Sequence, residues 1–350
     1  MTTGNGESDG PRTRRLREVP RRRRRGHRAA ARLGGSRRRA EPDTVVFDAQ
    51  QRDEGDGWSW RRVLVGGSPA VYGEVGDGPP VVFLHGWGLD PRVYKNGLAR
   101  LASARARVIA PALPGFGGTA ALTGHPWSIS GFGAWVAEFL DALGISERAL
   151  VMGHSFGGGV SIALCHDHPD RVRGLVLINS IGASAWSRRG VMPRTMAQRP
   201  LWDWGLRFPA DLWPLGQARR IIPAVFGEAI GNLVRDPLSV VKAADLARRA
   251  DLRRELEELK RRRLPVVVLW GSRDQLITRD AFEEMCELLG RPQAVTVEGS
   301  HGWLIADPDA FAEVVTNVVD IAARSRLRPR RPSRRLRSLV RRVVRLSRGD

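Results

Sequence analysis

Three residues of this 350-residue chain have the types and the chain order needed for nucleophilic catalysis, namely Ser155, Asp274 and His301. A serine hydroxyl is a weak nucleophile, so it needs a base to take its proton, and the base needs an acid that orients it. We therefore predict acyl transfer in which Ser155 attacks, His301 moves the proton and Asp274 orients the imidazole.

Ser155 lies in a G-x-S-x-G motif formed by residues 153–157. Such a motif places the serine on a strained turn between a strand and a helix, where the glycines let neighbouring backbone approach closely. The bare pattern is weak evidence in a chain with 39 glycines. Its position between an expected strand, 149–152, and an expected helix, 156–166, is what indicates a nucleophile elbow.

Two backbone amides are expected to stabilise the negative charge that develops on the substrate oxygen. The Phe156 N–H lies at the start of the helix after the nucleophile, and the Trp87 N–H lies in a His-Gly-Trp-Gly loop at 85–88, where the glycines let the backbone fold close to the elbow. We predict these two amides as the oxyanion hole. The residues predicted to line the substrate pocket are Gly86, Trp186 and Trp303.

The other two triad candidates also follow expected strands. Asp274 comes after the strand 266–270, and His301 comes after the strand 294–297. Each residue alone would be read as a turn or a helix cap. Because both follow strands in the order expected after the nucleophile, a purely structural explanation for all three is improbable.

The elements that must position these residues alternate along the chain. After an antiparallel pair, 60–65 and 70–74, expected strands alternate with expected helices, which is typical of a parallel sheet covered by helices on both faces. The fold class is therefore α/β, with a mostly parallel sheet. The remaining strands are expected at 81–84, 107–110, 149–152, 172–178, 266–270 and 294–297.

The alternation stops between the sixth and seventh strands, where 183–262 is helical and broken by prolines. We interpret this segment as a helical cap inserted into a core formed by 46–182 and 263–323. Aromatic residues in the cap favour a hydrophobic substrate, although the same side chains could simply pack the cap onto the core. These residues are Trp186, Trp202, Trp204, Phe208, Trp213 and Phe226.

The net charge of +20 belongs to the two ends of the chain. Residues 1–45, an expected disordered arm, have 14 arginines and five acids, and residues 324–350 have 12 arginines and one acid. The segment between them has 31 basic and 31 acidic side chains, so its chemistry does not require a polyanionic substrate.

The basic tail, 324–350, contains a predicted amphipathic helix at 333–348. Its apolar residues fall within an arc of about 160° and arginines fill the opposite side. The pattern favours attachment to an anionic membrane surface, with docking on the protein body or simple disorder as alternatives. Nucleic acid is a weaker partner because the tail has no aromatic residue for base stacking. Without a secretory signal or a bilayer-spanning run, the chain is expected in the cytoplasm, where this helix could hold it at the inner face of the membrane.

With these motifs, residues 70–323 resemble the α/β-hydrolase superfamily, specifically its capped serine-hydrolase branch of esterases and lipases. The resemblance implies an α/β-hydrolase fold with an eight-stranded, mostly parallel sheet, a Ser-Asp-His triad, no cofactor and no metal. Two positions depart from the family pattern. Ala112 replaces an acidic residue near the 114–117 loop, and Asn179 follows the sixth strand, where some relatives place the triad acid.

The resemblance leaves several activities open. Epoxide hydrolases and haloalkane dehalogenases of this fold attack with aspartate, so Ser155 argues against both. We expect hydrolysis of a small hydrophobic carboxylic ester or thioester through an acyl-enzyme. Carbon–carbon bond hydrolysis and cofactor-free perhydrolysis use the same triad and remain alternatives. A non-catalytic ligand receptor that retains the triad is the alternative from another class.

Overall fold

The computed structural model describes residues 47–52, 57–103, 106–187, 194–199 and 226–324, all within one unit, Asp43–Asp350. The predicted arm, the predicted helix at 333–348 and four of the six cap aromatics lie outside the described residues. Within the described part, no helix has the length and apolar character needed to cross a bilayer.

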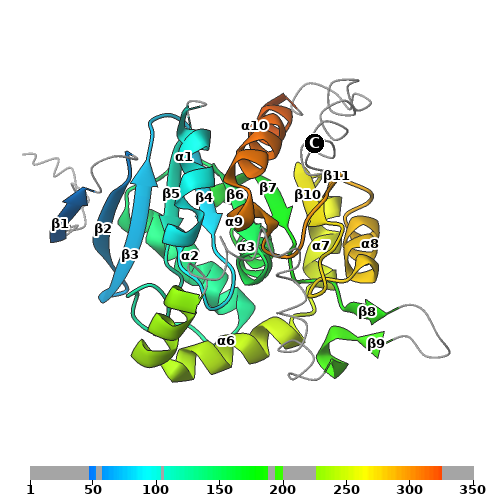
Figure 1. Cartoon of the computed structure of the whole chain (residues 1–350), viewed down its shortest axis with the longest axis horizontal. Helices are drawn as coiled ribbons and strands as arrows, with labels where there is room; N and C mark the ends of the chain where they lie inside the picture. The colour runs from blue at the N-terminus through cyan, green and yellow to red at the C-terminus, as the bar shows by residue number, and fades with distance from the viewer. Residues whose placement is uncertain (1–46, 53–56, 104–105, 188–193, 200–225, 325–350) are drawn as a thin grey trace, which may run out of the picture. The chain divides into compact units, whose positions relative to one another are not determined.

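A nine-stranded sheet forms the centre of the described unit, in the order β1-β2-β3-β5-β4-β6-β7-β10-β11 (Figure 1). The pairs β1–β2, β2–β3 and β3–β5 are antiparallel and all other pairs are parallel, which confirms a mostly parallel sheet. The strands are β1 (Phe47–Arg52), β2 (Ser59–Val65), β3 (Ser68–Val75), β4 (Pro80–Leu84), β5 (Arg107–Pro111), β6 (Ala149–His154), β7 (Val172–Ile178), β10 (Val266–Gly271) and β11 (Gln293–Val297).

The edge strand β1 is the one strand of this sheet that was not predicted. Its sequence, FDAQQR, has neither the alternation nor the β-branched residues that mark a strand, and β1 pairs only with β2. The hairpin between β2 and β3 is as predicted. Gly66 and Gly67 both have positive φ, 55° and 80°, which is the backbone that a tight two-residue turn between twisted strands needs.

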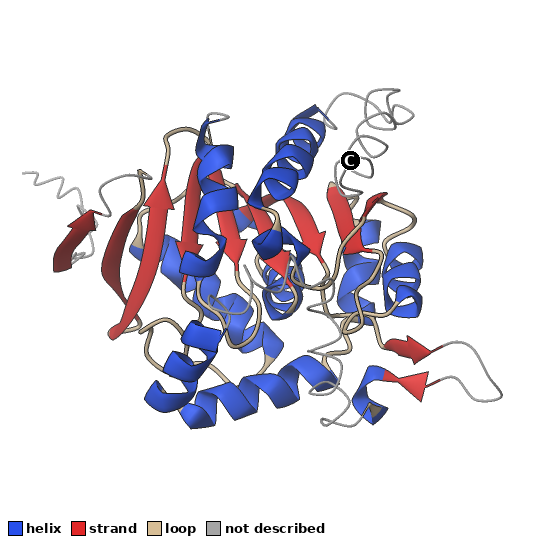
Figure 2. Ribbon diagram, viewed as in Figure 1, coloured by secondary structure: helices blue, strands red, loops and turns tan. Residues whose placement is uncertain are grey.

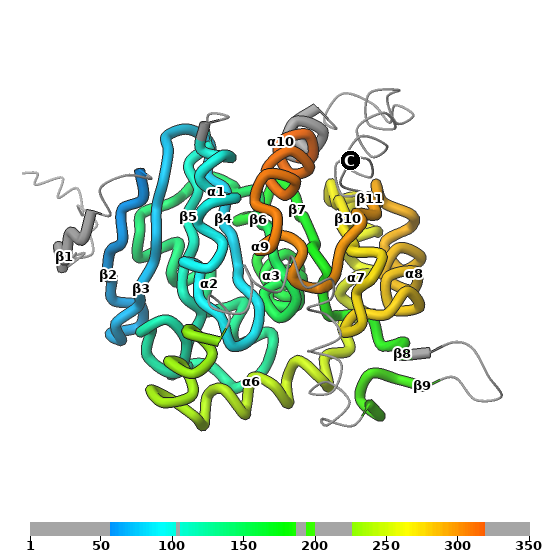
Figure 3. Tube along the Cα trace, viewed as in Figure 1, coloured from blue at the N-terminus to red at the C-terminus, as the bar shows by residue number. Residues whose placement is uncertain are grey.

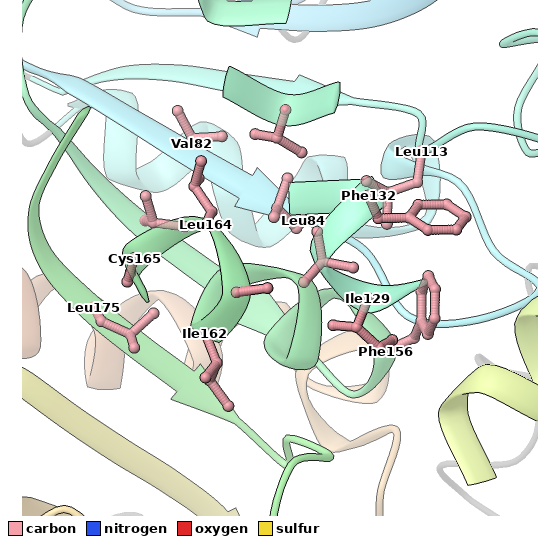
Figure 4. Packing of buried hydrophobic residues seen from close by; sticks show 14 of the residues in the cluster. Val82, Leu84, Leu113, Ile129, Phe132, Phe156, Ile162, Leu164, Cys165 and Leu175 are labelled. Atoms are coloured by element: carbon pink, nitrogen blue, oxygen red, sulfur yellow. The ribbon is translucent and has the colours of Figure 1, made fainter. Parts of the chain in front are cut away.

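Helices cover both faces of the sheet (Figure 2). One layer contains α2 (Ile129–Ala142), α3 (Phe156–Asp167), α7 (Arg253–Arg261) and α8 (Arg279–Leu288), and the other contains α1 (Lys95–Ser103), α9 (Trp303–Ala306) and α10 (Pro308–Arg324). Side chains of β4 alternate between the two cores: Val82 and Leu84 join the first (Figure 4), and Phe83 joins the second. This alternation shows that β4 is buried on both faces, as expected for a central strand of a sheet covered by two helix layers.

Between β7 and β10 the described chain forms β8 (Ala185–Ser187), β9 (Arg194–Thr195), a short 3-10 turn η3 (Met196–Gln198), helical residues 226–235, α6 (Pro237–Arg249) and α7. The helical residues 226–235 and α6 are called the insertion helices below. They lie beyond the carboxyl ends of the parallel strands (Figure 3). In contrast, α7 buries Leu256 and Leu259 in the same core as α3, so the structure places α7 with the helix layer of the sheet.

Candidate active site

Ser155 occupies the sharp turn between β6 and α3. Its backbone has φ 53° and ψ −115°, outside the regions that side chains favour. Hydrogen bonds hold this conformation: the Ser155 N–H donates to the Ile178 carbonyl at 3.0 Å, and the Ser155 carbonyl accepts from the amides of Gly158 and Ile181 at 3.0 and 3.3 Å. The strained backbone of Ser155 is therefore held by the end of β7 and the first turn of α3, as a nucleophile elbow requires.

Steric crowding explains why the motif has glycine at positions 153 and 157. A Cβ at Gly157 would lie 2.2 Å from the Leu84 carbonyl oxygen, and one at Gly153 would lie 2.4 Å from the Gly157 carbonyl oxygen. Both contacts are with backbone, which cannot move aside as the end of a side chain can. The elbow thus fits only because these two positions have no side chain.

Asp274 and His301 are brought together as predicted. The Asp274 Oδ2 atom lies 2.8 Å from His301 Nδ1, and the other carboxylate oxygen accepts the amides of Leu276 and Ile277, both at 2.8 Å. A carboxylate that accepts from Nδ1 places the imidazole proton on that nitrogen, so that Nε2 is the ring nitrogen that can accept a proton. Asp274 is buried, so this orientation is well protected from water.

A second set of hydrogen bonds holds the His301 backbone. Its carbonyl lies 3.1 Å from His154 Nε2 and 3.1 Å from Asn179 Nδ2. Tyr94 completes the network: its hydroxyl accepts the Gly86 N–H at 3.2 Å and lies 2.9 Å from His154 Nδ1. One tautomer satisfies all of these contacts, with Tyr94 donating to Nδ1 and Nε2–H donating to the His301 carbonyl.

This network connects the Ser155 turn to the His301 loop. His154 directly precedes Ser155, and its ring centroid lies 4.9 Å from that of His301. Asn179, which has φ 43°, also accepts the Gly271 N–H at 3.0 Å, so it joins the ends of β7 and β10 to the His301 loop. Asn179, which cannot serve as a triad acid, therefore links these two strand ends to the loop of His301. Neither His154 nor Tyr94 was predicted.

The expected oxyanion donors occupy the two segments that meet at the elbow. Phe156 is the first residue of α3, where a backbone N–H has no acceptor within its own helix. Trp87 follows β4, and its indole N–H donates to the Val240 carbonyl of α6 at 2.8 Å. Gly86 approaches the network closely, since a Cβ there would lie 2.9 Å from His154 Nδ1.

The two predicted pocket tryptophans lie in different surroundings. Trp303 is buried in the core beside α10, with its ring 5.9 Å from that of Phe311. It therefore packs as a core residue, which differs from the predicted pocket position. Trp186 lies beside the Asp274 loop, where it lines a cavity of about 580 Å³ together with Trp270 and Asp274.

A buried arginine that was not predicted supports the Asp274 loop. Arg199 is fully buried, and its guanidinium donates to the carbonyls of Leu276 and Gln275 at 2.7 and 2.8 Å. These carbonyls belong to the turn whose amides bond the Asp274 carboxylate. No motif marks this arginine among the many in the sequence, because its role depends on a contact between segments about 75 residues apart in the chain.

Burial keeps two histidines of the site neutral. His85 accepts the Leu113 N–H at Nε2 and lies 2.8 Å from the Gly86 carbonyl through Nδ1, and burial lowers its pKa to about 4. Burial also lowers the pKa of His154 well below the usual value. In the unfolded chain both rings take a proton near pH 6.5. Neutral histidines therefore contribute to stability above that pH.

We expect the free energy of unfolding to fall as the pH drops from about 6.5 to 4, with His85 alone contributing about 3 kcal/mol of the loss. The reason is that the unfolded chain binds more protons than the folded one in this window. Denaturant unfolding at several pH values measures the slope. The variant His85→Gln, whose amide can accept and donate in the same place, should show a flatter dependence, and an unchanged slope would contradict this explanation.

Two curated proteins are similar to this chain in sequence. The chain is 30% identical over 265 residues to a pimeloyl-[acyl-carrier protein] methyl ester esterase of Aromatoleum aromaticum, a match that covers 69% of this chain and 98% of the relative. It is 39% identical over 126 residues to a 2-hydroxy-6-oxo-2,4-heptadienoate hydrolase of Pseudomonas putida, with 35% and 45% covered.

The fold is also similar to solved structures. An esterase from Exiguobacterium antarcticum superposes with a TM-score of 0.60 at 22% identity, with 73% of this chain and 97% of that chain covered. A family model described as the alpha/beta hydrolase family matches residues 81–314, which is more than half of the chain. This protein therefore belongs to the alpha/beta hydrolase family.

Proposed function

We propose that this hydrolase cleaves a carboxylic ester or thioester with a hydrophobic acyl or alkyl group, through an acyl-enzyme on Ser155. The observation that carries the proposal is the 2.8 Å hydrogen bond between Asp274 and His301, on a loop that His154 ties to the strained Ser155 turn. This arrangement has the components of serine-dependent acyl transfer, namely a presented nucleophile, an oriented base and a buried acid.

In the first half-reaction, Ser155 Oγ attacks the carbonyl carbon while its proton passes to His301 Nε2. The positive imidazolium that results is stabilised by the Asp274 carboxylate, to which Nδ1–H remains bonded at 2.8 Å. The tetrahedral intermediate then breaks its bond to the leaving alkoxide or thiolate, which takes the proton from Nε2. Ser155 is left as an ester of the acyl group.

In the second half-reaction, water repeats the attack on the acyl-enzyme. His301 Nε2 takes a proton from the water, and the second tetrahedral intermediate collapses to release the carboxylic acid and restore the Ser155 hydroxyl. In both steps the backbone amides of Trp87 and Phe156 would donate to the oxyanion. Each such donor typically contributes about 3 kcal/mol to transition-state stabilisation.

The relatives support ester chemistry and also one alternative. The esterase of Aromatoleum aromaticum covers most of this chain, which favours an ester. The Pseudomonas putida hydrolase is more similar in sequence but over a shorter segment, and by its name it acts on a 2-hydroxy-6-oxo-dienoate. Carbon–carbon bond hydrolysis of such a ketone therefore remains the second candidate, since the same triad can serve it.

A series of p-nitrophenyl esters tests the proposed substrate class. We expect kcat/KM to rise by up to about 10²-fold from acetate to hexanoate, because each buried methylene contributes about 0.8 kcal/mol to transition-state binding. The initial rate of p-nitrophenol release measures this directly. A preference for acetate would contradict a hydrophobic pocket, and turnover of a vinylogous 1,5-diketone without turnover of any ester would favour the carbon–carbon hydrolase.

A further inference from the structure

The insertion helices expose an unusual concentration of large apolar side chains. Of the eight large apolar residues that are exposed in the described part of the chain, six lie within 226–241. We call these six the outer face, and their exposed fractions range from 47% to 77%. The outer face consists of Phe226, Ile230, Leu233, Val234, Leu238 and Val241.

The first insertion helix has its apolar side turned away from the protein. At 100° per residue, its four outer-face residues fall within an arc of about 100°. The opposite side contains Asn232, which is 1% exposed; its Nδ2 donates to the Gly88 carbonyl at 3.1 Å and its Oδ1 accepts the Gly117 N–H at 2.9 Å. A surface helix of a water-soluble domain normally has the reverse arrangement. The polar side of this helix therefore contacts the protein body, and its apolar side is exposed to solvent.

The second insertion helix, α6, continues this exposed surface. Its inward side buries Val240, Ala243 and Ala247, while Leu238 and Val241 point outward. The Val240 carbonyl accepts the indole N–H of Trp87, the residue after Gly86 in the predicted oxyanion loop. Trp87 itself is 43% exposed. The outer face therefore lies on the helices that hold this loop.

The charges around the outer face favour an anionic partner. Lys242 is exposed beside it on α6, and so is Arg249, which also pairs with Asp245. Arg235 is exposed on the Asn232 side of its helix, where its guanidinium donates to Asn232 Oδ1 at 3.4 Å. The nearby acids are engaged: Asp236 accepts the amide and hydroxyl of Ser239, and Asp245 pairs with Arg248 and Arg249. The whole chain also has a net charge of +20, which draws it toward negatively charged surfaces.

The composition of the outer face distinguishes a lipid from a protein partner. Five of its six residues are Leu, Ile or Val, whereas residues that dominate protein–protein binding are Trp, Tyr and Arg. Helices that lie in the plane of a membrane typically have apolar side chains on one side and cations beside them. Their apolar side enters the bilayer at the boundary between lipid headgroups and acyl chains.

We propose that the outer face docks onto an anionic lipid bilayer, with the insertion helices parallel to the membrane plane. This contact is separate from the C-terminal helix predicted at 333–348. Docking does not depend on the proposed function. Its consequence does, because a hydrophobic ester could then pass from the bilayer to the oxyanion loop without crossing water.

Vesicle flotation of the full chain tests the docking. The vesicles contain phosphatidylcholine with about 30% phosphatidylglycerol, and about 0.5 M NaCl weakens the long-range attraction of the arginine-rich ends. We expect the double variant Ile230→Gln/Val234→Gln to reduce the vesicle partition coefficient by at least about tenfold, because two apolar side chains no longer enter the bilayer. Leu64→Gln is the matched control, since Leu64 is 38% exposed on β2, and it should leave partitioning unchanged.

Two further measurements keep the outcomes distinct. Fluorophosphonate labelling in vesicle-free solution should be equal in wild type and the double variant, which shows that the site is intact whatever the lipid result. Equal partitioning of wild type and the double variant would overturn the proposal. The competing possibility is that a second copy of this chain covers the outer face, and sedimentation analysis tests it. A wild-type dimer and a monomeric double variant, with equal partitioning of both proteins into vesicles, would assign the outer face to a dimer contact.

Discussion

The variant Ser155→Ala is expected to lose about 10⁶-fold in kcat for ester hydrolysis while it folds as the wild type does. Without the hydroxyl no acyl-enzyme can form, so only the oxyanion amides and substrate positioning still accelerate attack by water. Alanine retains the Cβ that the turn already accommodates, and the backbone bonds of residue 155 to Ile178 and Gly158 do not involve the side chain. Initial rates with a p-nitrophenyl ester measure the loss.

Ser161→Ala is the matched control for this variant. Ser161 is also buried in α3, and its hydroxyl donates to the Gly157 carbonyl at 2.7 Å, within the helix. Its removal affects local hydrogen bonding but no proposed chemical step, so activity should stay within a few-fold of wild type. Comparable losses in both variants would mean that α3 tolerates no change, and activity retained in Ser155→Ala would refute the nucleophile assignment.

Asp274→Asn is expected to lower kcat by about 10⁴-fold with little change in structure. The asparagine Oδ1 can still accept the amides of Leu276 and Ile277, which leaves its NH₂ group facing His301 Nδ1. Two donors cannot share a hydrogen bond, so His301 would move its proton to Nε2. In this tautomer the ring cannot accept the Ser155 proton, and the rate of fluorophosphonate labelling should fall together with kcat.

The exposed Asp251 provides the control for this effect. Its carboxylate also accepts a backbone amide and pairs with Arg253, but it contacts no residue of the triad. Asp251→Asn should therefore leave kcat unchanged. If Asp274→Asn keeps kcat within tenfold of wild type, the acid of the triad must lie elsewhere, and Asp274 would be only a turn residue.

The parts of the site that could be predicted are those that depend on local order in the sequence. Asp274 and His301 could be assigned as partners because each follows a strand of one parallel sheet, and the carboxyl ends of such strands lie at one edge of the sheet. The elbow could be assigned because strand, G-x-S-x-G and helix occur together. Each of these features is defined by residues close together in the sequence, so it can be recognised without the structure.

The remaining parts depend on contacts between distant segments. The bonds of Asn179 and His154 to the His301 carbonyl join residues more than 120 positions apart, and nothing in the pattern around either residue marks that role. The core packing of Trp303 could not be predicted for a similar reason, because an aromatic residue next to the His301 loop can turn into the core as readily as into a pocket.

The outer face shows a different limit of sequence interpretation. Helical periodicity at 226–241 reveals an apolar arc, but periodicity is the same whether that arc faces the core or the solvent. Only the buried contacts of Asn232 with the loops at Gly88 and Gly117 determine which way the helix is turned.

The central claim is that Ser155 is a nucleophile activated by His301. Peptide mass spectrometry after reaction with a fluorophosphonate tests it most directly, because the probe phosphonylates only a serine whose hydroxyl proton is being removed. The account predicts one phosphonyl group per chain, on Ser155, and none on Ser155→Ala. An intact, folded protein that is not labelled, or that is labelled on another serine, would contradict it.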